Sequence, residues 1–155
     1  MKPNVYNFFK FLNQKENKPI PFRAKLIYAP ETLTPQDLNV EGDLNLSNTP
    51  ITSLSKDLTV DGFLDLENTP ITSLPKGLTV GSWLDLRNTK ITSLPDGLTV
   101  GGSLNLSNTP ITSLPKGLTV GGFLFLKNTP LSNKTDKEIK AMIGPQGYIK
   151  GNIIR

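Results

Sequence analysis

One stretch of twenty residues recurs five times in this chain and constrains its fold more than any other feature. A fixed period of this length is typical of a solenoid, in which each copy forms one coil and buries its apolar side against its neighbours. We therefore expect the 155 residues to form one domain built as a stack of coils. The copies begin at Leu38, Leu58, Leu78, Leu98 and Leu118.

The third copy shows what one coil contains. Leu84 and Leu86 alternate with polar or aromatic residues, the period-2 pattern of a short strand with one buried face. Residues 88–95 then place Ile91 and Leu94 inward before the chain turns at a proline and a glycine. Each copy thus predicts one strand, two bends and a return path. Stacked coils would set their strands side by side and parallel, about 4.8 Å apart.

These residues resemble the leucine-rich repeat family, whose short form reads LxxLxLxxNxL followed by an LP turn. The resemblance covers residues 38–131, although Thr89 stands where the family has Asn and Gly81 where it has its first Leu. It implies a curved, parallel β arc, and a flatter right-handed β-solenoid is the alternative. The near-identical copies are also similar to small leucine-rich repeat proteins of bacteria and bacteriophages. The matching residues of the third copy are Leu84, Leu86, Ile91, Leu94 and Pro95.

The segment before the repeats, residues 1–37, is predicted to be an N-terminal cap. Residues 3–15 are predicted to form a helix because their apolar side chains recur at helical spacing. Residues 24–28 are predicted to add a degenerate strand. Such a cap would cover the open end of the first coil, where backbone groups otherwise lack partners.

The segment after the repeats, residues 132–155, is predicted to be a C-terminal cap. Thr135 and Glu138 have the spacing of a capping box and precede an apolar stripe, which indicates a short helix. A terminal strand is expected from Tyr148 to Ile154. The predicted fold class is therefore a repeat solenoid, α/β or mainly β, with a helical cap at one end and a helix-and-strand cap at the other.

Two polar positions are identical in all five copies, an Asn and the Thr that follows it. In a parallel stack each position forms a column, whose side chains can hydrogen-bond to the copies above and below as Asn ladders do. We interpret both columns as structural, since a functional site rarely needs the same residue in every coil. The columns are Asn48, Asn68, Asn88, Asn108 and Asn128, and Thr49, Thr69, Thr89, Thr109 and Thr129.

The outward strand positions are those at which the copies differ strongly, and the resemblance implies that this face is a binding surface. Phe63 and Trp83 would lie one strand apart as an exposed aromatic strip, and apolar patches bordered by polar groups mark contacts. Trp and Arg are also frequent interface hot spots. An alternative place for Phe123 and Phe125 is beneath the C-terminal segment. The expected partner-binding residues are Phe63, Asp65, Glu67, Trp83, Asp85, Arg87, Asn105, Phe123 and Phe125.

Two carboxylates on this face need separate treatment. Asp65 and Asp85 would be neighbours on adjacent strands, with Cα atoms about 5 Å apart. Like charges at that range raise one pKa, and such pairs can serve acid–base catalysis or hold a cation. Here they are flanked by Asn45 and Asn105 on an open face, and no further catalytic group is evident. We therefore expect a solvated, negatively charged recognition strip, with no enzymatic activity, no metal and no cofactor.

Composition removes several kinds of chemistry. The chain has no Cys and no His, which excludes disulfides, thiolate chemistry and imidazole as a base or metal ligand. The net charge is +4, but residues 38–117 hold five basic against eight acidic residues, so no phosphate-binding stripe runs along the repeats. No secretory signal or membrane-spanning stretch is evident, which makes the cytoplasm the expected location.

The sequence favours a non-enzymatic module that binds another protein through the variable face of its repeat strands. We expect no membrane, nucleic acid or small molecule as its partner. One alternative is a bacteriophage inhibitor of a host defence protein. The other is a carbohydrate-binding module in which Trp83 or Phe63 stacks on a sugar. The sugar hydroxyls would then bond to Asp65, Asp85 and Asn105.

Overall fold

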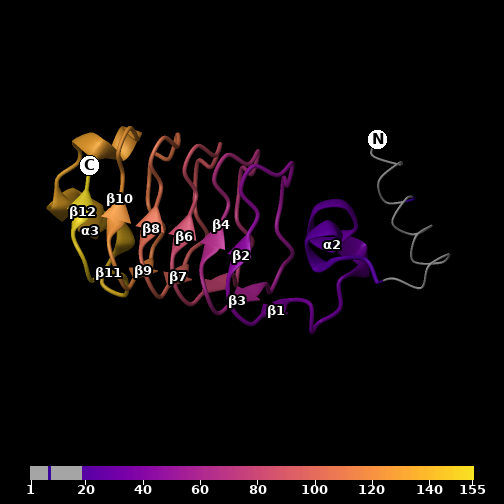
Figure 1. Cartoon of the computed structure of the whole chain (residues 1–155). Helices are drawn as coiled ribbons and strands as arrows, with labels where there is room; N and C mark the ends of the chain where they lie inside the picture. Colours follow the sequence, from indigo (N-terminus) through magenta and orange to yellow (C-terminus); the bar gives the residue numbers. More distant parts are fainter. Residues whose placement is uncertain (1–6, 8–18) are drawn as a thin grey trace.

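The chain folds into a β-solenoid in which each repeat contributes two short strands (Figure 1). The computed structural model describes Asn7 and residues 19–155. Equivalent strands of successive coils pair in parallel and form two six-stranded sheets, here named after their first strands. The β1 sheet contains β1 (Asn39–Val40), β3 (Thr59–Val60), β5 (Thr79–Val80), β7 (Thr99–Val100), β9 (Thr119–Val120) and β11 (Tyr148–Ile149). The β2 sheet contains β2 (Leu44–Asn45), β4 (Leu64–Asp65), β6 (Leu84–Asp85), β8 (Leu104–Asn105), β10 (Leu124–Phe125) and β12 (Ile153–Ile154).

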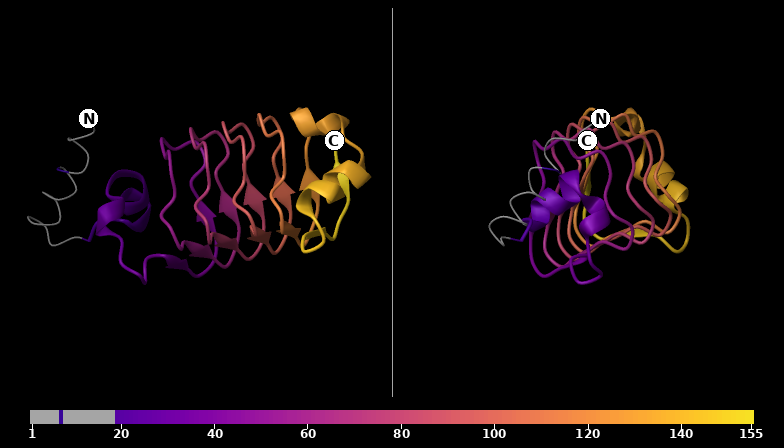
Figure 2. Two further views of the ribbon diagram at one scale, coloured as in Figure 1. Left: turned by 180° about the vertical axis from the view of Figure 1, so that it is seen from behind. Right: turned by 90° about the vertical axis from the view of Figure 1, so that its right-hand side faces the viewer.

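The five repeat copies form coils 1 to 5, stacked in a row around a common interior (Figure 2). Leu64, Leu84 and Leu104 are register partners in the β2 sheet, and all three side chains are fully buried. Burying a leucine stabilises the fold by about 1.5–3 kcal/mol, and each coil buries its leucines only against its neighbours. The prediction of a repeat solenoid with these leucines inside is confirmed, and the fold is mainly β.

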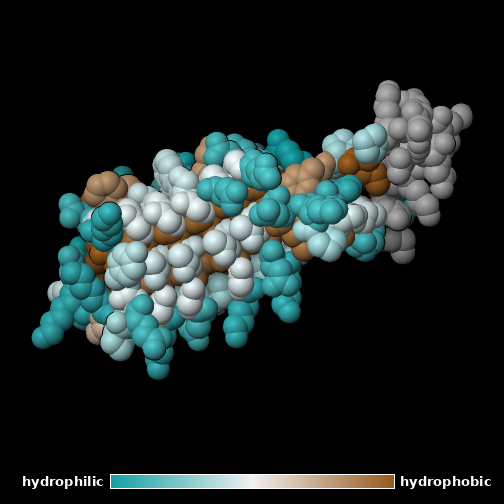
Figure 3. Space-filling model, turned by 90° about the horizontal axis from the view of Figure 1, so that it is seen from below, coloured by the Kyte–Doolittle hydropathy of each residue, from teal (hydrophilic) through white to brown (hydrophobic). Residues whose placement is uncertain are grey.

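Each coil has a second strand that the sequence pattern does not predict. In coil 3 this strand is β5, where Val80 is buried and Thr79 is exposed. Two residues span a single alternation, which is too short for a period-2 pattern to be distinguished from a turn. The prediction of one strand per coil is therefore wrong, because the return path is itself paired into a sheet. Viewed from below, side chains of one kind run in rows along the stack, as in-register pairing requires (Figure 3).

The turn between the two strands of a coil brings neighbouring coils very close together. The backbone N–H of Gly101 donates to the carbonyl oxygen of Val80 at 2.9 Å. A Cβ atom at Gly101 would collide with the carbonyl oxygen of Gly81 in the preceding coil. Glycine is needed at this position because only a residue without a side chain permits that approach.

The Asn column forms the predicted ladder, with one interruption. All five Asn residues have positive φ, between 55° and 58°, a conformation that Asn adopts more readily than most residues. Between coils 2 and 3 the ladder is interrupted, because Asn88 Nδ2 donates to Glu67 Oε1 at 3.3 Å. The ladder bonds run from Asn68 to Asn48 (3.0 Å), from Asn108 to Asn88 (2.9 Å) and from Asn128 to Asn108 (2.8 Å).

The Thr column does not join the coils, so that part of the prediction is wrong. Each hydroxyl donates to the carbonyl oxygen of the leucine three residues earlier in the same coil, as Thr89 Oγ1 does to Leu86 at 2.7 Å. The hydroxyl bonds within its own coil, and not to the next one, because the chain turns directly after the strand and brings the leucine carbonyl within reach. The Thr column is therefore structural, but it stabilises each turn separately.

At the N-terminal end, α2 (Phe22–Tyr28) lies against the first coils (Figure 1). The strand predicted over residues 24–28 is wrong, since a short apolar run fits either type of element. A helix satisfies its own backbone groups, so it covers the end of the stack through buried Leu26 without adding an open strand edge. Apart from Asn7, the helix predicted over residues 3–15 lies outside the described residues.

At the C-terminal end, α3 (Asp136–Ile143) begins with the predicted capping box. The backbone N–H of Thr135 donates to Glu138 Oε2 at 2.7 Å, and Thr135 Oγ1 accepts from the backbone N–H of Glu138 at 3.2 Å. These bonds satisfy two donors that the first helical turn would otherwise leave unpaired. Two short 3-10 helices complete the described elements, η1 (Pro30–Thr32) and η2 (Pro130–Asn133).

The single strand predicted from Tyr148 to Ile154 is wrong. This segment holds β11 and β12, which are separated by a bend and pair with β9 and β10. A bend here lets both sheets gain one more strand, so the chain ends in a further coil.

Among the described residues, no helix has both the length and the apolar character needed to cross a membrane.

Candidate functional site

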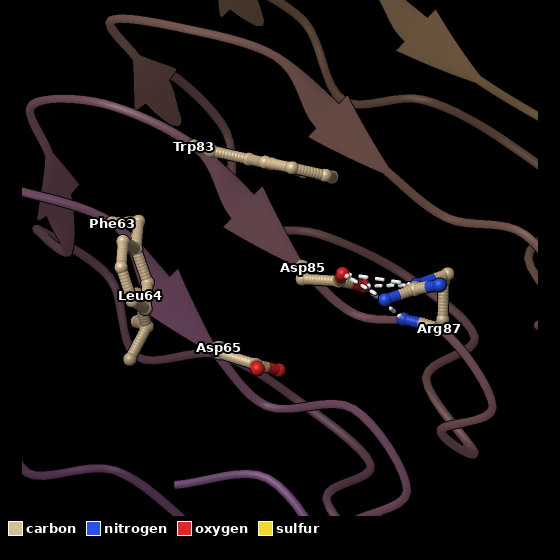
Figure 4. Close-up of a pocket in the computed structure, with 6 residues that line it drawn as sticks. All are labelled: Phe63, Leu64, Asp65, Trp83, Asp85 and Arg87. Atoms are coloured by element: carbon tan, nitrogen blue, oxygen red, sulfur yellow. Dashed lines mark hydrogen bonds and ion pairs between the residues drawn. The ribbon is translucent and has the colours of Figure 1, made fainter. Parts of the chain in front are cut away.

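The outward positions that differ between copies lie on the β2 sheet and at its flanks. On coils 2 and 3 they surround an open hollow of about 210 Å³. Half of its lining comes from each coil, because the in-register pairing of β4 with β6 places equivalent positions side by side. The hollow is lined by Phe63, Leu64, Asp65, Trp83, Asp85 and Arg87 (Figure 4).

Two aromatic side chains form the apolar part of the hollow. Trp83 is 43% exposed and Phe63 is partly buried. Each immediately precedes its strand, Phe63 before β4 and Trp83 before β6, so both occupy the same position in adjacent coils. The structure thus places both rings where the sequence predicts an exposed aromatic strip.

The residue after the central leucine has a structural role in four coils. Its side-chain Oδ1 accepts the backbone N–H of the residue two positions later, at closely similar distances. Coils 1 and 4 use Asn for this bond, whereas coils 2 and 3 use Asp. The turn therefore requires the oxygen atom but not the negative charge. The four bonds are Asn45 with Ser47 (2.9 Å), Asp65 with Glu67 (2.9 Å), Asp85 with Arg87 (3.0 Å) and Asn105 with Ser107 (3.0 Å).

Arg87 is held as a fixed cation between two carboxylates. Its Nε donates to both oxygens of Asp85, at 3.0 and 2.9 Å, and its Nη2 donates to Glu67 Oε2 at 2.8 Å. Such charge-assisted bonds are shorter and stronger than neutral ones. The hydrogen bonds with Asp85 raise the pKa of the Arg87 guanidinium above its ordinary value. The guanidinium thus links coil 2 to coil 3 and is charged at any physiological pH.

Asp85 and Asn105 do not belong to a solvated strip, so the prediction is wrong for these two residues. Asp85 is 7% exposed and Asn105 is 8% exposed. Arg87 covers the Asp85 carboxylate, and the side chains of both adjacent strands crowd it at the close spacing of a sheet. Of the acidic residues lining the hollow, only Asp65 is partly exposed.

Asp65 has no cationic partner among the residues that the structure describes. Apart from its turn bond, the carboxylate accepts only a long hydrogen bond from Asn45 Nδ2, at 3.3 Å. Asp65, Glu67 and Asp85 lie close together beside a single guanidinium, so the acidic groups outnumber the cation by two. The hollow therefore combines an exposed indole with an unbalanced carboxylate.

The same three carboxylates raise the question of a metal site. One oxygen atom from each of the three lies within 4.8 Å of the other two. A hard cation such as Ca²⁺ requires six to eight oxygen ligands, whereas each of these three residues offers one ligand atom at this spacing. Arg87 already provides the positive charge between Glu67 and Asp85. The arrangement therefore fits an ion-pair cluster rather than a metal centre.

Coil 4 ends the site, because it presents small polar residues at the equivalent positions. Ser103 Oγ accepts the backbone N–H of Phe123 at 3.0 Å. Asn105 is the register partner of Asp85 but is buried and does not line the hollow. Of the predicted site residues, Asn105 thus lies next to the hollow and contributes nothing to its surface.

Phe123 and Phe125 belong to coil 5 and form a separate aromatic pair. Their ring centroids are 6.2 Å apart, with the ring planes inclined at 60°. Phe123 is exposed, while Phe125 is partly buried and is the register partner of Ile154 in β12. The C-terminal segment therefore lies beside this pair without covering Phe123, and coil 4 separates the pair from Trp83.

Two features of the hollow escape sequence reasoning. Leu64 lines it, but a leucine stands at this position in every copy, so comparison of the copies gives no signal. The pairing of Arg87 with Asp85 is indicated by the sequence, since residues two apart on a strand face the same side. From the opposite charges of these two residues on one face, one could have predicted that Arg87 covers Asp85.

Comparison with known proteins leaves the chain without an identified relative. A scan against protein-family models, a search of curated proteins and a search of solved structures each found no match.

Proposed function

We propose that this protein is a non-enzymatic binding module that recognises another protein through the hollow on coils 2 and 3. The observation that carries the proposal is the contrast with the neighbouring coils. Asn45 and Asn105 make the same turn bond as Asp65 and Asp85 without any charge. The fold therefore does not require the charged and aromatic side chains that coils 2 and 3 display.

The composition of the hollow is suited to a protein contact. An exposed aromatic patch bordered by polar groups is typical of interaction surfaces, and Trp and Arg are the residue types most enriched at hot spots. Arg87 is already fixed by Asp85 and Glu67, so it would lose little side-chain entropy on binding. A partner that covers Trp83 would remove from water an indole that is 43% exposed in the free protein.

The assignment to leucine-rich repeats is part of this proposal. It is supported by the period of twenty residues, the two buried leucines in the β2-sheet strand region of each repeat and the LP turn. Within it, a bacteriophage inhibitor of a host defence protein is a special case of the same binding function. Capture from a bacterial lysate would separate that case from binding to a partner encoded with the protein.

The test is affinity capture followed by mass spectrometry, with a face-reset variant as the matched control. This variant copies the coil 4 side chains Ser103, Asn105 and Ser107 onto coils 2 and 3. Because coil 4 has the same backbone and turn bond, the variant should keep its circular dichroism spectrum and melting temperature. We expect it to lose the partner that the unmodified protein captures, whereas equal capture by both would refute the hollow as the site. The substitutions are Phe63→Ser, Asp65→Asn, Glu67→Ser, Trp83→Ser, Asp85→Asn and Arg87→Ser.

A carbohydrate is the second candidate partner, favoured by one observation. Trp83 is exposed next to the Asp65 carboxylate, and an aromatic ring with an adjacent acceptor is a common arrangement for a sugar ring and its hydroxyls. Burial of Asp85 and Asn105 weakens this candidate, since both are unavailable to a ligand in the described conformation. A glycan array probed with the unmodified protein and the face-reset variant would decide between the two.

A further inference from the structure

We propose that the hollow on coils 2 and 3 receives an arginine side chain of the partner protein. This inference rests on the proposed protein-binding function and names the chemistry that the hollow selects. It rests on three points: the position of the indole relative to an open carboxylate, the electrostatic balance of the hollow, and the shape of the group that can contact both.

The first point is the position of the indole relative to the carboxylate. Trp83 and Asp65 come from adjacent strands and, with Asp85 between them, point to the same side of the sheet (Figure 4). Strand spacing and the rise along a strand put two such diagonal positions about 8 Å apart. A planar group can therefore contact the indole face while its edge reaches the carboxylate. Cations bind aromatic faces within about 6 Å of the ring centroid, and Trp is the strongest of these rings.

The second point is the electrostatic balance of the hollow. The repulsion between Arg87 and an incoming cation is offset, because Asp85 and Glu67 both pair with its guanidinium. Asp65 adds a further carboxylate that has no cationic partner in the described part of the chain. An acidic ligand would meet net repulsion here, and an apolar one would remove Asp65 from water without pairing it.

The third point is the shape of a group that can contact both the Trp83 indole and the Asp65 carboxylate. A guanidinium is planar, stacks on aromatic faces and donates two parallel hydrogen bonds to one carboxylate. A lysine ammonium is a compact and strongly hydrated charge that cannot stack in this way. Asp65 has one oxygen in its turn bond with the Glu67 backbone, and its other oxygen accepts only a long bond from Asn45. That carboxylate therefore has acceptor capacity left for a donor from the partner.

Trp83 makes the inference directly testable, because it is the only tryptophan in the chain. Its fluorescence therefore reports on the hollow alone. The probe is N-acetyl-arginine amide, with N-acetyl-lysine amide and the neutral N-acetyl-citrulline amide as matched comparisons. We expect a saturable change with the arginine probe, with a dissociation constant on the order of a millimolar for so small a ligand. Binding of the other two probes should be at least about tenfold weaker, the discrimination expected of a charge-assisted, stacked contact.

The key variant is Asp65→Asn, which the fold tolerates because Asn45 and Asn105 occupy the equivalent positions. It should weaken the arginine probe about tenfold, the scale of one lost charge-assisted bond. Asp96→Asn is the matched control, since Asp96 is an exposed acid in a turn where the neighbouring coils carry Lys76 and Lys116. It should leave the titration unchanged.

Four results would overturn the inference: no response of Trp83 to the arginine probe, equal binding of the citrulline probe, equal binding of the lysine probe, or an unchanged affinity in Asp65→Asn. The proposed protein-binding function fails separately. If the arginine probe leaves Trp83 unaffected while the face-reset variant still loses its captured partner, the arginine inference is wrong and the binding site stands. If the face-reset variant retains the partner, the site itself is wrong.

Discussion

Coils 3 and 4 have the same backbone architecture but present different side chains on their outer faces. Both bury a leucine at the centre of the β2-sheet strand, both close the next turn with a side-chain oxygen, and both place an Asn at positive φ. Coil 3 nevertheless shows Trp83, Asp85 and Arg87 where coil 4 shows only serines and an asparagine. The interior of a coil and its outer face are therefore independent in this fold, so that one can vary while the other stays fixed.

The largest expected effect is on the free energy of unfolding, and it tests whether the interiors of coils 3 and 4 are equivalent. Leu84→Ala and Leu104→Ala should each lower the free energy of unfolding by about 2–5 kcal/mol, because each removes a fully buried side chain and leaves a cavity. Urea denaturation followed by circular dichroism measures both values. A difference greater than about 1 kcal/mol between them would show that the outer face contributes to the interior and would break the comparison.

The next effect concerns the ion pairs that coil 4 lacks. Arg87→Ser should destabilise by about 1–2 kcal/mol, because it removes the cation from the Asp85 carboxylate, which is only 7% exposed in the unmodified protein. This is less than for a fully buried pair, since the Arg87 side chain is 38% exposed and solvent screens its charge. Adding Asp85→Asn should restore most of the loss, because the double variant reproduces Asn105 and Ser107.

Thermal or urea unfolding at fixed salt measures both Arg87 variants. Lys127→Ser provides the control, since Lys127 occupies the same position in coil 5, is exposed and makes no ion pair with any described residue. It should change the stability by less than about 0.5 kcal/mol. Failure of Asp85→Asn to rescue Arg87→Ser would mean that Arg87 stabilises the coil by packing rather than by neutralising Asp85.

The Asn ladder gives a smaller effect, which should differ between coil 4 and coil 2. Asn108 takes part in two ladder bonds, to Asn88 and from Asn128, whereas Asn68 takes part in one, to Asn48. Glycine permits the positive φ, so Asn108→Gly and Asn68→Gly remove the bonds without straining the backbone. We expect a loss of about 1 kcal/mol for Asn108→Gly and about half of that for Asn68→Gly, measured by urea unfolding. Equal losses would show that the interruption at Glu67 has no energetic consequence.

The smallest expected effect is on stability at the outer face. Trp83→Ser should change the free energy of unfolding by less than about 0.5 kcal/mol, because the indole is 43% exposed and Ser103 occupies the same position in coil 4. Differential scanning calorimetry would detect a larger change. A marked drop in melting temperature would make Trp83 a structural residue and remove the main support for a binding surface.

The sequence predicted the interior well because the interior is what the copies share. Leu84 and its equivalents recur every twenty residues, and only stacking can bury a pattern with that period. The location of the outer face followed from the differences between the copies at Phe63, Trp83 and Arg87. Both inferences use comparison of the chain with itself, which is reliable wherever many copies can be compared.

Features that occur once or span few residues were not predictable in the same way. The apolar run at 24–28 is too short to distinguish a helix from a strand, and β5 contains two residues only. Burial of Asp85 depends on where Arg87 places its guanidinium, which is decided by Glu67 in the adjacent coil. The repeat gives the register of the two coils, but it does not give the side-chain conformation in which Arg87 contacts both carboxylates.

The glycines that begin the turn in coils 3, 4 and 5, together with the shared leucines, give these coils the same upper and lower surface. Recombination between copies this alike can delete a unit such as residues 98–117 in frame, and the remaining coils would meet with matched seams. That deletion would set Trp83 beside Phe123 and Asp85 beside Phe125. Two surfaces that are now apart would merge without a single point mutation, so a change in copy number is a direct evolutionary route to a new partner.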